Sequence, residues 1–117
     1  MLVTQHAKLL RIHISANDRY QGKPLYEAIV ARCRDLKIAG ATVFRGLEGY
    51  GETATLHKHH LARAEEPVLI AIVDTADAIE RLVAQIEPMI DTGLIAISPV
   101  EVIRVQKRPD AGAPRQL

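Results

Sequence analysis

The stretch GLEGYGETATLHKHH, from Gly46 to His60, gathers most of the residue types in this chain that could do chemistry. Its glycines, at positions 46, 49 and 51, could let the backbone approach a phosphate group and direct N–H groups at the phosphate oxygens. The same glycines could instead form only a bulge and a sharp exit from a strand. A lone glycine-rich turn leaves both interpretations open.

Three of the five histidines, His57, His59 and His60, follow these glycines. Imidazole is a good ligand for zinc, copper or nickel, so the three side chains are candidates for a metal site. His57 and His59 share a face only in a strand, whereas His57 and His60 share one only in a helical turn. No cysteine supports them, and a solvated basic loop is the alternative. We expect no metal here and keep the metal site as the alternative hypothesis.

The sequence shows no recognisable catalytic pattern. Ser15 and Ser98 have no evident base beside them, and Glu48 and Glu52 are typical of exposed charges in irregular chain. The single cysteine, Cys33, falls among the apolar positions of a predicted helix, which is typical of a small buried hydrophobic residue. We therefore expect a protein that is not an enzyme.

Strands and helices must position the Gly46–His60 stretch. Alternating or continuous apolar residues predict strands at 7–16, 41–51, 67–74 and 93–105. In the first strand, Leu10, Ile12 and Ile14 share one face and Leu9, Arg11 and His13 share the other. Apolar stripes at helical spacing predict two helices. The stripe residues are Leu25, Ile29, Cys33 and Leu36, then Ile79, Leu82, Val83, Ile86 and Ile90.

Capping and turn residues set the expected ends of these elements. Gly40 is predicted to end the first helix in a left-handed conformation, and Asp74 to cap the start of the second. Pro88 is predicted to break the second helix near Glu87, because proline lacks an N–H donor. For the same reason Pro99 is expected to bend or bulge the last strand. The segment between the first strand and the first helix is expected to be a polar connection.

The resulting order is β-α-β-β-α-β. Its simplest packing is an α+β, ferredoxin-like fold, with an antiparallel sheet and two helices on one face. The run PVLIAIVD, residues 67–74, is almost continuously apolar and predicts a strand buried on both faces. Two helices cover only one face, so we expect another copy of the chain to cover the other.

The overall composition further limits the classes of protein to which this chain can belong. A length of 117 residues fits one domain, which we place at 1–107, and we expect the polar tail at 108–117 to be disordered. A net charge of +1 and only four aromatic residues argue against a nucleic-acid partner. The chain start does not resemble a signal peptide, and no apolar run approaches the roughly 18 residues of a membrane helix. We expect a cytoplasmic protein.

Two separated segments resemble the PII signalling proteins. GATVFRGLEGYG, from Gly40 to Gly51, is similar to the PII signature in which a G-x-T-V strand runs into G-F-G, with one extra residue here. SPVEVIRV, from Ser98 to Val105, resembles the P-V-E segment near the PII C-terminus. The chain most resembles the PII-like group called domain of unknown function family 190, whose members show G-x-E-G-Y-G before a histidine-containing segment. The resemblance covers about residues 7–107.

The resemblance implies a homotrimer with inward-facing sheets and an adenine nucleotide in the clefts between subunits. The second phosphate loop of PII proteins is replaced by the short DTGLIA, which favours AMP or ADP over a triphosphate. The glutamine that follows G-F-G in PII proteins has no counterpart, because Glu52 and Thr53 follow Gly51, and this argues against 2-oxoglutarate. The implied nucleotide-binding positions are Thr42, Gly49, Tyr50, Gly51, Glu52 and Arg104.

The functional prediction is a PII-like signalling protein that senses AMP or ADP. The segment at 46–63 occupies the place of the PII T-loop, and the resemblance implies that it relays the bound state to a target such as a membrane transporter. The alternative is a metal-binding trimer, similar to copper-tolerance proteins, that uses His57, His59 and His60.

Overall fold

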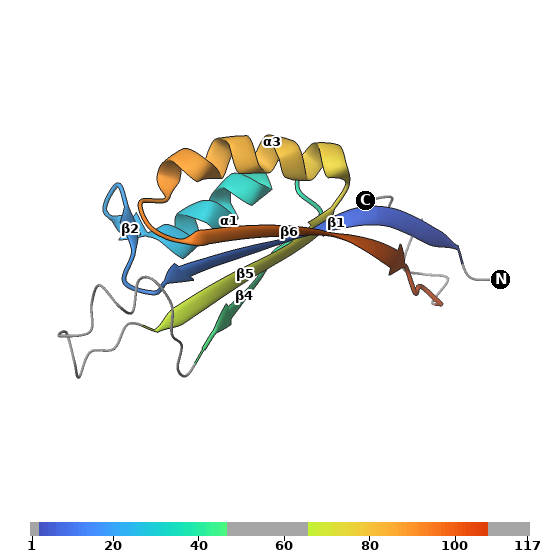
Figure 1. The fold of residues 1–117 in the computed structure, drawn as a ribbon, viewed down its shortest axis with the longest axis horizontal. Helices are drawn as coiled ribbons and strands as arrows, with labels where there is room; N and C mark the ends of the chain where they lie inside the picture. Colours follow the sequence, from blue (N-terminus) through green and yellow to red (C-terminus); the bar gives the residue numbers. More distant parts are fainter. Residues whose placement is uncertain (1–2, 47–65, 108–117) are drawn as a thin grey trace.

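The computed structural model describes residues 3–46 and 66–107. The elements are β1 (Thr4–Ser15), β2 (Arg19–Tyr20), β3 (Lys23–Pro24), α1 (Leu25–Asp35), β4 (Thr42–Arg45), β5 (Pro67–Asp74), α3 (Ala76–Ile86), the 3-10 helix η2 (Glu87–Met89) and β6 (Leu94–Ile103). Four strands form an antiparallel sheet in the order β4-β5-β1-β6, and both helices lie on one face of it (Figure 1). The α+β, ferredoxin-like βαββαβ fold predicted from the sequence is confirmed.

The hydrophobic core lies between the sheet and the two helices. In β1 and β5 every second side chain points toward the helices. The apolar stripes of α1 and α3 pack against these side chains. The fully buried side chains come from all four of these elements. They include Leu10 and Ile12 of β1, Ile70 and Ile72 of β5, Leu25 and Ile29 of α1, and Ile79, Leu82 and Ile86 of α3.

Within one chain, strand β5 is buried on one face only; the expected burial on both faces depends on a second copy of the chain and stays a prediction. Val68, Ile70 and Ile72 are buried beneath the helices, whereas Leu69 and Val73 are only half-buried. No helix among the described residues lies on the side of Leu69 and Val73 (Figure 1). One face of the sheet, to which the half-buried apolar side chains of β5 point, therefore has no helix over it.

The left-handed residue that terminates α1 is Lys37 rather than Gly40, which corrects the predicted cap. Lys37 has a positive φ of 58°, its N–H bonds to the Arg34 carbonyl at 3.0 Å, and the Ile38 N–H bonds to the Cys33 carbonyl at 3.0 Å. These two bonds form a Schellman motif, and the buried Ile38 and Cys33 side chains supply its usual apolar contact. Gly40 has no positive φ, so any residue could adopt its backbone conformation.

Thr75, not Asp74, caps the start of α3. The Thr75 Oγ1 accepts a hydrogen bond from the Ala78 N–H at 3.1 Å. The buried Asp74 carboxylate instead accepts from the N–H groups of Thr75, at 2.7 Å, and Ala39, at 2.9 Å. Asp74 therefore ties the start of α3 to the loop before β4. At its other end α3 stops at Ile86 and gives way to η2, as Pro88 predicted.

The connection between β1 and α1 contains a small hairpin that the sequence reasoning did not predict. Strands β2 and β3 pair two residues each, and their turn places Gln21 at φ 50° and Gly22 at φ 81°. Two successive positive φ angles are typical of a type I′ turn, whose twist suits a two-residue hairpin loop.

Strand β6 is continuous through Pro99, which corrects the predicted bulge. Ser98 pairs with Leu9 and Pro99 with Lys8 in an unbroken register, and β6 is an edge strand, where a missing donor is tolerated. Beyond Lys8, the residues of β1 from Thr4 to Ala7 pair only with β6. The sheet thus narrows to a two-stranded arm (Figure 1).

Candidate functional site

Thr42 lies at the start of β4, an edge strand of the sheet, and its side chain is exposed. It pairs with Ala71 of β5, which pairs in turn with Arg11 of β1, and Arg11 with Ala96 of β6. Residues directly opposite each other in a sheet point to the same face. Thr42 therefore points to the face that the helices leave uncovered.

Arg104 lies just after the end of β6, at the opposite edge of the sheet, and is also exposed. Arg104 lies eight positions after Ala96, the β6 residue that stands in line with Thr42 across the sheet. With strands about 4.8 Å apart and a rise of about 3.3 Å per residue, Thr42 and Arg104 are on the order of 30 Å apart. One chain does not bring these two predicted site residues together.

The other predicted nucleotide-binding residues, Gly49, Tyr50, Gly51 and Glu52, lie outside the described residues, as do His57, His59 and His60. The structure does describe the two positions that flank this segment. Gly46 follows β4 and Glu66 precedes β5, so the segment leaves and re-enters the sheet between two paired, adjacent strands.

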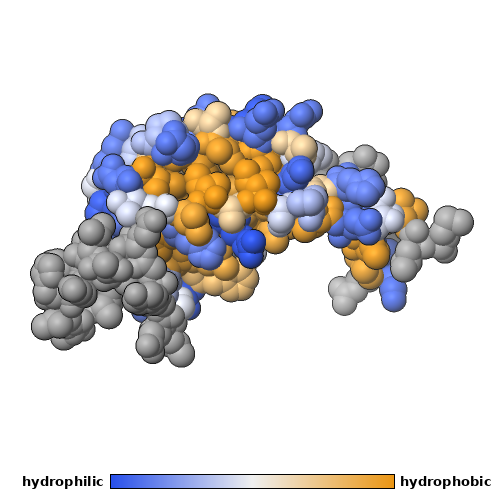
Figure 2. All heavy atoms as spheres, in the orientation of Figure 1, coloured by the Kyte–Doolittle hydropathy of each residue, from blue (hydrophilic) through white to orange (hydrophobic). Residues whose placement is uncertain are grey.

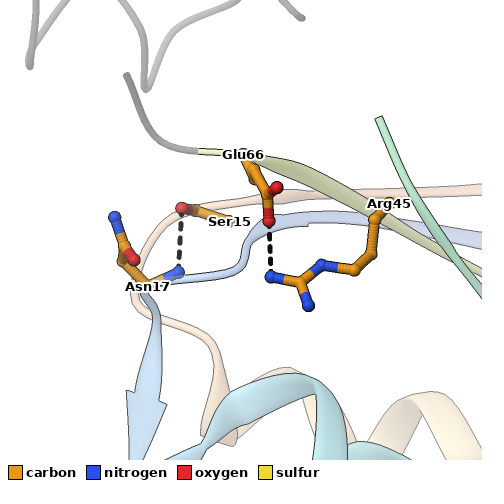
Figure 3. Close-up of polar contacts among 4 residues, drawn as sticks. All are labelled: Ser15, Asn17, Arg45 and Glu66. Atoms are coloured by element: carbon orange, nitrogen blue, oxygen red, sulfur yellow. Dashed lines mark hydrogen bonds and ion pairs between the residues drawn. The ribbon is translucent and has the colours of Figure 1, made fainter. Parts of the chain in front are cut away.

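Three contacts close the base of the segment. The Gly46 N–H donates to the Pro67 carbonyl at 2.8 Å, and the Ala16 N–H donates to the Glu66 carbonyl at 2.9 Å. The Arg45 guanidinium forms an ion pair with the Glu66 carboxylate (Figure 3). The two ends of the segment are therefore held to each other and to the end of β1.

Only a glycine fits at position 46. A Cβ built there would lie 2.8 Å from the Pro67 Cγ, and the pyrrolidine ring has little freedom to move away. The first glycine of the Gly46–His60 stretch thus has a packing role at the base of the segment. Its role gives no support to a phosphate contact at this position.

An open groove that the sequence reasoning missed runs beside α1. Its volume is about 660 Å³, and Tyr26, one of its lining residues, has the guanidinium carbon of Arg45 at 6.0 Å from its ring centre. The sequence feature that could have indicated this groove is the polar side of α1, which carries Tyr26 and Arg34 away from the buried stripe. Basic and acidic side chains both line the groove, so it has no clear preference for an anion. The lining includes Tyr20, Lys23, Tyr26, Glu27, Arg34, Asp35 and Val43.

The uncovered face of the sheet, called the open face below, is a further candidate surface. The strand registers place three rows of side chains across it. A first row holds Phe44, Leu69, His13 and Leu94; a second holds Thr42, Ala71, Arg11 and Ala96; a third holds Val73, Leu9 and Ser98. Phe44 is 51% exposed and Leu94 59% exposed. Such large exposed apolar side chains, gathered on one face, are typical of a surface that contacts another protein.

A second apolar area lies on the side of the molecule where α3 and β6 meet. Hydrophobic atoms gather near the centre of Figure 2, over the place where Figure 1 draws these two elements. In β6 the side chain of Ile97 is 50% exposed, and in α3 that of Val83 is half-buried. Apolar surface therefore continues around the β6 edge of the sheet.

The described residues hold no group of three or more histidine, cysteine, aspartate or glutamate side chains that could bind a metal ion. Cys33 is buried, and this burial raises the pKa of its thiol to about 11. A thiol with so high a pKa is a poor metal ligand or nucleophile at neutral pH. Within the same described ranges, no helix has both the length and the apolar character needed to cross a membrane.

Comparison with known families gives a match over most of the chain. Residues 7–102 match the family DUF190, described as an uncharacterised ACR. A UPF0166 protein of Aquifex aeolicus is 40% identical over 98 residues, which are 82% of this chain and 92% of the relative. A UPF0166 protein of Methanocaldococcus jannaschii is 30% identical over 100 residues, which are 84% of this chain and 93% of the relative.

Solved structures of PII-like proteins share the fold. CPII of Thiomonas intermedia K12, bound to ADP, AMP and acetate, matches with a TM-score of 0.65 at 15% identity, covering 87% of this chain and 93% of that one. A second CPII structure, described as a nitrogen regulatory PII-like protein bound to ADP, AMP and bicarbonate, gives a TM-score of 0.65 at 16% identity, covering 89% and 94% of the two chains. A PII-like signalling protein of Thermus thermophilus gives 0.60 at 13% identity, covering 86% and 91%. The predicted PII-like fold is confirmed.

Proposed function

This chain belongs to the DUF190 family, and from that premise we propose that it is a PII-like regulatory protein that binds AMP or ADP between the subunits of a homotrimer. The proposal assigns it no catalysed reaction. Its main support is the fold shared with CPII, whose structures hold ADP and AMP.

The separation of Thr42 and Arg104 is the observation that bears on where the nucleotide would lie. The two residues are at opposite edges of the sheet, on the order of 30 Å apart in one chain by strand geometry. In a ring of identical subunits, one edge of each chain meets the opposite edge of the next. Such a head-to-tail contact, with neighbouring chains shifted along the strand direction, would bring Thr42 of one chain toward Arg104 of its neighbour.

The open face supports the assembly. Its apolar side chains have no cover within the described chain, and burying apolar surface contributes roughly 25 cal/mol per Å². A second copy is the economical cover, since most soluble oligomers contain identical chains in a closed arrangement.

The contacts that hold the two ends of the segment after Arg45 support a role of this segment in transmitting nucleotide binding to a target protein. The Arg45–Glu66 ion pair holds both ends of the segment, while Arg45 also lies against Tyr26 of α1. A nucleotide bound at the β4 edge would lie beside these contacts and could change the conformation of the segment that they hold. We propose that the segment presents this change to a partner protein.

Isothermal titration with AMP and ADP tests the proposed ligand. A charge-assisted hydrogen bond is typically worth about 1.5 to 3 kcal/mol, so Arg104→Ala should weaken binding by roughly 10- to 150-fold. Arg81→Ala is the matched control, because Arg81 is equally exposed but lies on α3 in the helical layer. Absence of binding to the unmodified protein at millimolar nucleotide would overturn the proposal.

A mixing experiment tests whether two chains share the site. Thr42→Arg should block the site from the β4 edge, and Arg104→Ala should weaken it from the β6 edge. If each site takes one residue from each of two neighbours, random mixed trimers of the two variants should recover about a quarter of the tight sites. If both residues act within one chain, mixing recovers none, and the shared site is wrong even where the nucleotide binds.

A further inference from the structure

Arg11 stands near the middle of the open face, where a charged residue is unexpected. It lies on β1, one of the two central strands, and its row neighbours are Ala71 on one side and Ala96 on the other. The neighbouring rows carry larger side chains, with Leu69 and Leu94 in one and Leu9 in the other. Arg11 is therefore flanked by two small side chains on a largely apolar face.

This guanidinium has no counter-charge in the part of the chain that the structure describes. Arg11 is exposed and makes no hydrogen bond or ion pair there. The described strand residues that point to the open face include no aspartate or glutamate. The nearest ionisable neighbour on that face is His13, two residues along β1 and about 7 Å away, and it offers no carboxylate.

Covering the open face would bury this charge. An arginine side chain keeps its proton at every pH that a protein tolerates, so burial cannot neutralise it. Leaving a buried charge without a partner strongly destabilises the folded protein. A second copy of the chain presents the same acid-free face, so the described strands of a neighbour supply no carboxylate either.

We infer that Arg11 binds a compact oxyanion of the phosphate or sulfate class, held between copies of the chain at the open face. The inference rests on the proposed assembly, because only a covered face makes the counter-charge necessary. The planar guanidinium fork can donate two parallel hydrogen bonds to such an anion.

The surroundings of Arg11 fit an anion of this size. Ala71 and Ala96 present only methyl groups, so the two positions beside Arg11 carry little bulk that would hinder an anion from reaching its guanidinium. Thr42, at the end of the same row, is two strands from Arg11, or about 9.6 Å, and offers a hydroxyl donor. His13 adds a ring N–H donor to the same face.

Thermal unfolding with inorganic phosphate or sulfate, against chloride at equal ionic strength, tests the inference. Either oxyanion should raise the unfolding midpoint of the unmodified protein in proportion to the logarithm of its concentration, because it binds the folded state alone. Arg11→Met keeps the length of the side chain without its charge and should abolish this rise. Arg81→Met, on the exposed surface of α3, should leave it intact.

Arg11→Lys provides a second variant if Arg11→Met does not assemble. It retains the charge but loses the paired donors, so it should keep the trimer and lower the apparent affinity for phosphate at least tenfold. An equal rise in the unmodified protein and in both Arg11 variants would overturn the inference. A trimer whose midpoint responds to neither oxyanion would overturn it as well, while leaving the proposed assembly standing.

Nucleotide titration of the same variants separates this site from the proposed nucleotide site. AMP should bind Arg11→Met as tightly as it binds the unmodified protein. A loss of AMP affinity in Arg11→Met but not in Arg104→Ala would mean that the open face holds the nucleotide, which would overturn a separate oxyanion site. A monomer in light scattering would instead contradict the assembly in the proposed function.

Discussion

Cys33 illustrates how the environment of one side chain decides its chemistry. The residue lies on the buried stripe of α1, with only 3% of its surface exposed, and burial raises the pKa of its thiol from 9.0 to about 11. Because the apolar surroundings disfavour the thiolate, the side chain acts as a small hydrophobic residue at neutral pH. The expectation from the helical spacing is confirmed.

The raised pKa of Cys33 predicts a pH dependence of stability. The folded state holds the thiol proton more tightly than the unfolded chain, so this contribution to the free energy of unfolding is fully present below pH 9 and is lost as the pH rises through about 11. Urea unfolding across this range should show the destabilisation caused by Cys33→Ala shrinking with rising pH. A constant difference between the two proteins would contradict the prediction, since the titration of all other groups cancels in the comparison.

At the scale of elements, the end of α1 shows how a hydrogen-bond pattern overrides the residue preferred at a turn. The Schellman bonds from Lys37 and Ile38 fix the left-handed position at Lys37, three residues before the glycine that the sequence reasoning chose. The position is set by burial, because Ile38 must reach the core beside Cys33 for the chain to turn toward β4.

Substitution at this helix end tests the assignment. Lys37→Gly should raise the free energy of unfolding by up to about 1 kcal/mol, because a left-handed residue with a Cβ is strained by about that amount, partly offset by the entropy of glycine. Gly40→Ala is the matched comparison: a Cβ there meets nothing within 4 Å, so it should stabilise by about 0.4–1 kcal/mol. Chemical denaturation measures both. Destabilisation by Gly40→Ala would restore Gly40 as the cap.

At the scale of the whole molecule, the open face decides how the chain meets its surroundings. One layer of helices covers one face of the sheet, while the rows through Leu69, Ala71 and Val73 stay only half-buried. The two-stranded arm formed by β1 and β6 beyond Lys8 also lacks a third strand for support. Isolated two-stranded ribbons are marginally stable in water, so both features favour contact with other copies.

A charge placed on the open face should separate the chains without unfolding them. Leu69→Arg introduces an arginine into the row that holds Phe44 and Leu94, on the side of β5 opposite the core. Light scattering should then show the mass of a single chain where the unmodified protein gives a trimer, and circular dichroism should show an unchanged fold. Ala84→Glu on the exposed surface of α3 serves as the control and should remain trimeric. An unmodified protein that is already monomeric would contradict the proposed assembly.

The sequence by itself determined the two α-helices, the four strands of the main sheet and the two layers, but not the short β2–β3 hairpin. A helix is assigned by the apolar spacing of Leu25, Ile29 and Cys33, and a strand by the alternation of Leu10, Ile12 and Ile14. Each pattern also identifies the buried side of its element, because both periods are properties of the local backbone. The order of elements then leaves few topologies, and the β4-β5-β1-β6 sheet is the simplest of them.

Only the tertiary structure decided which residues meet. The partners of the Asp74 carboxylate, the ion pair between Arg45 and Glu66, and the separation of Thr42 from Arg104 depend on strand register and order, which join residues far apart in the chain. Local spacing carries no information on such distances. The structure likewise revealed that Arg11 stands alone among small residues, because its neighbours come from two other strands that only the folded sheet brings beside it.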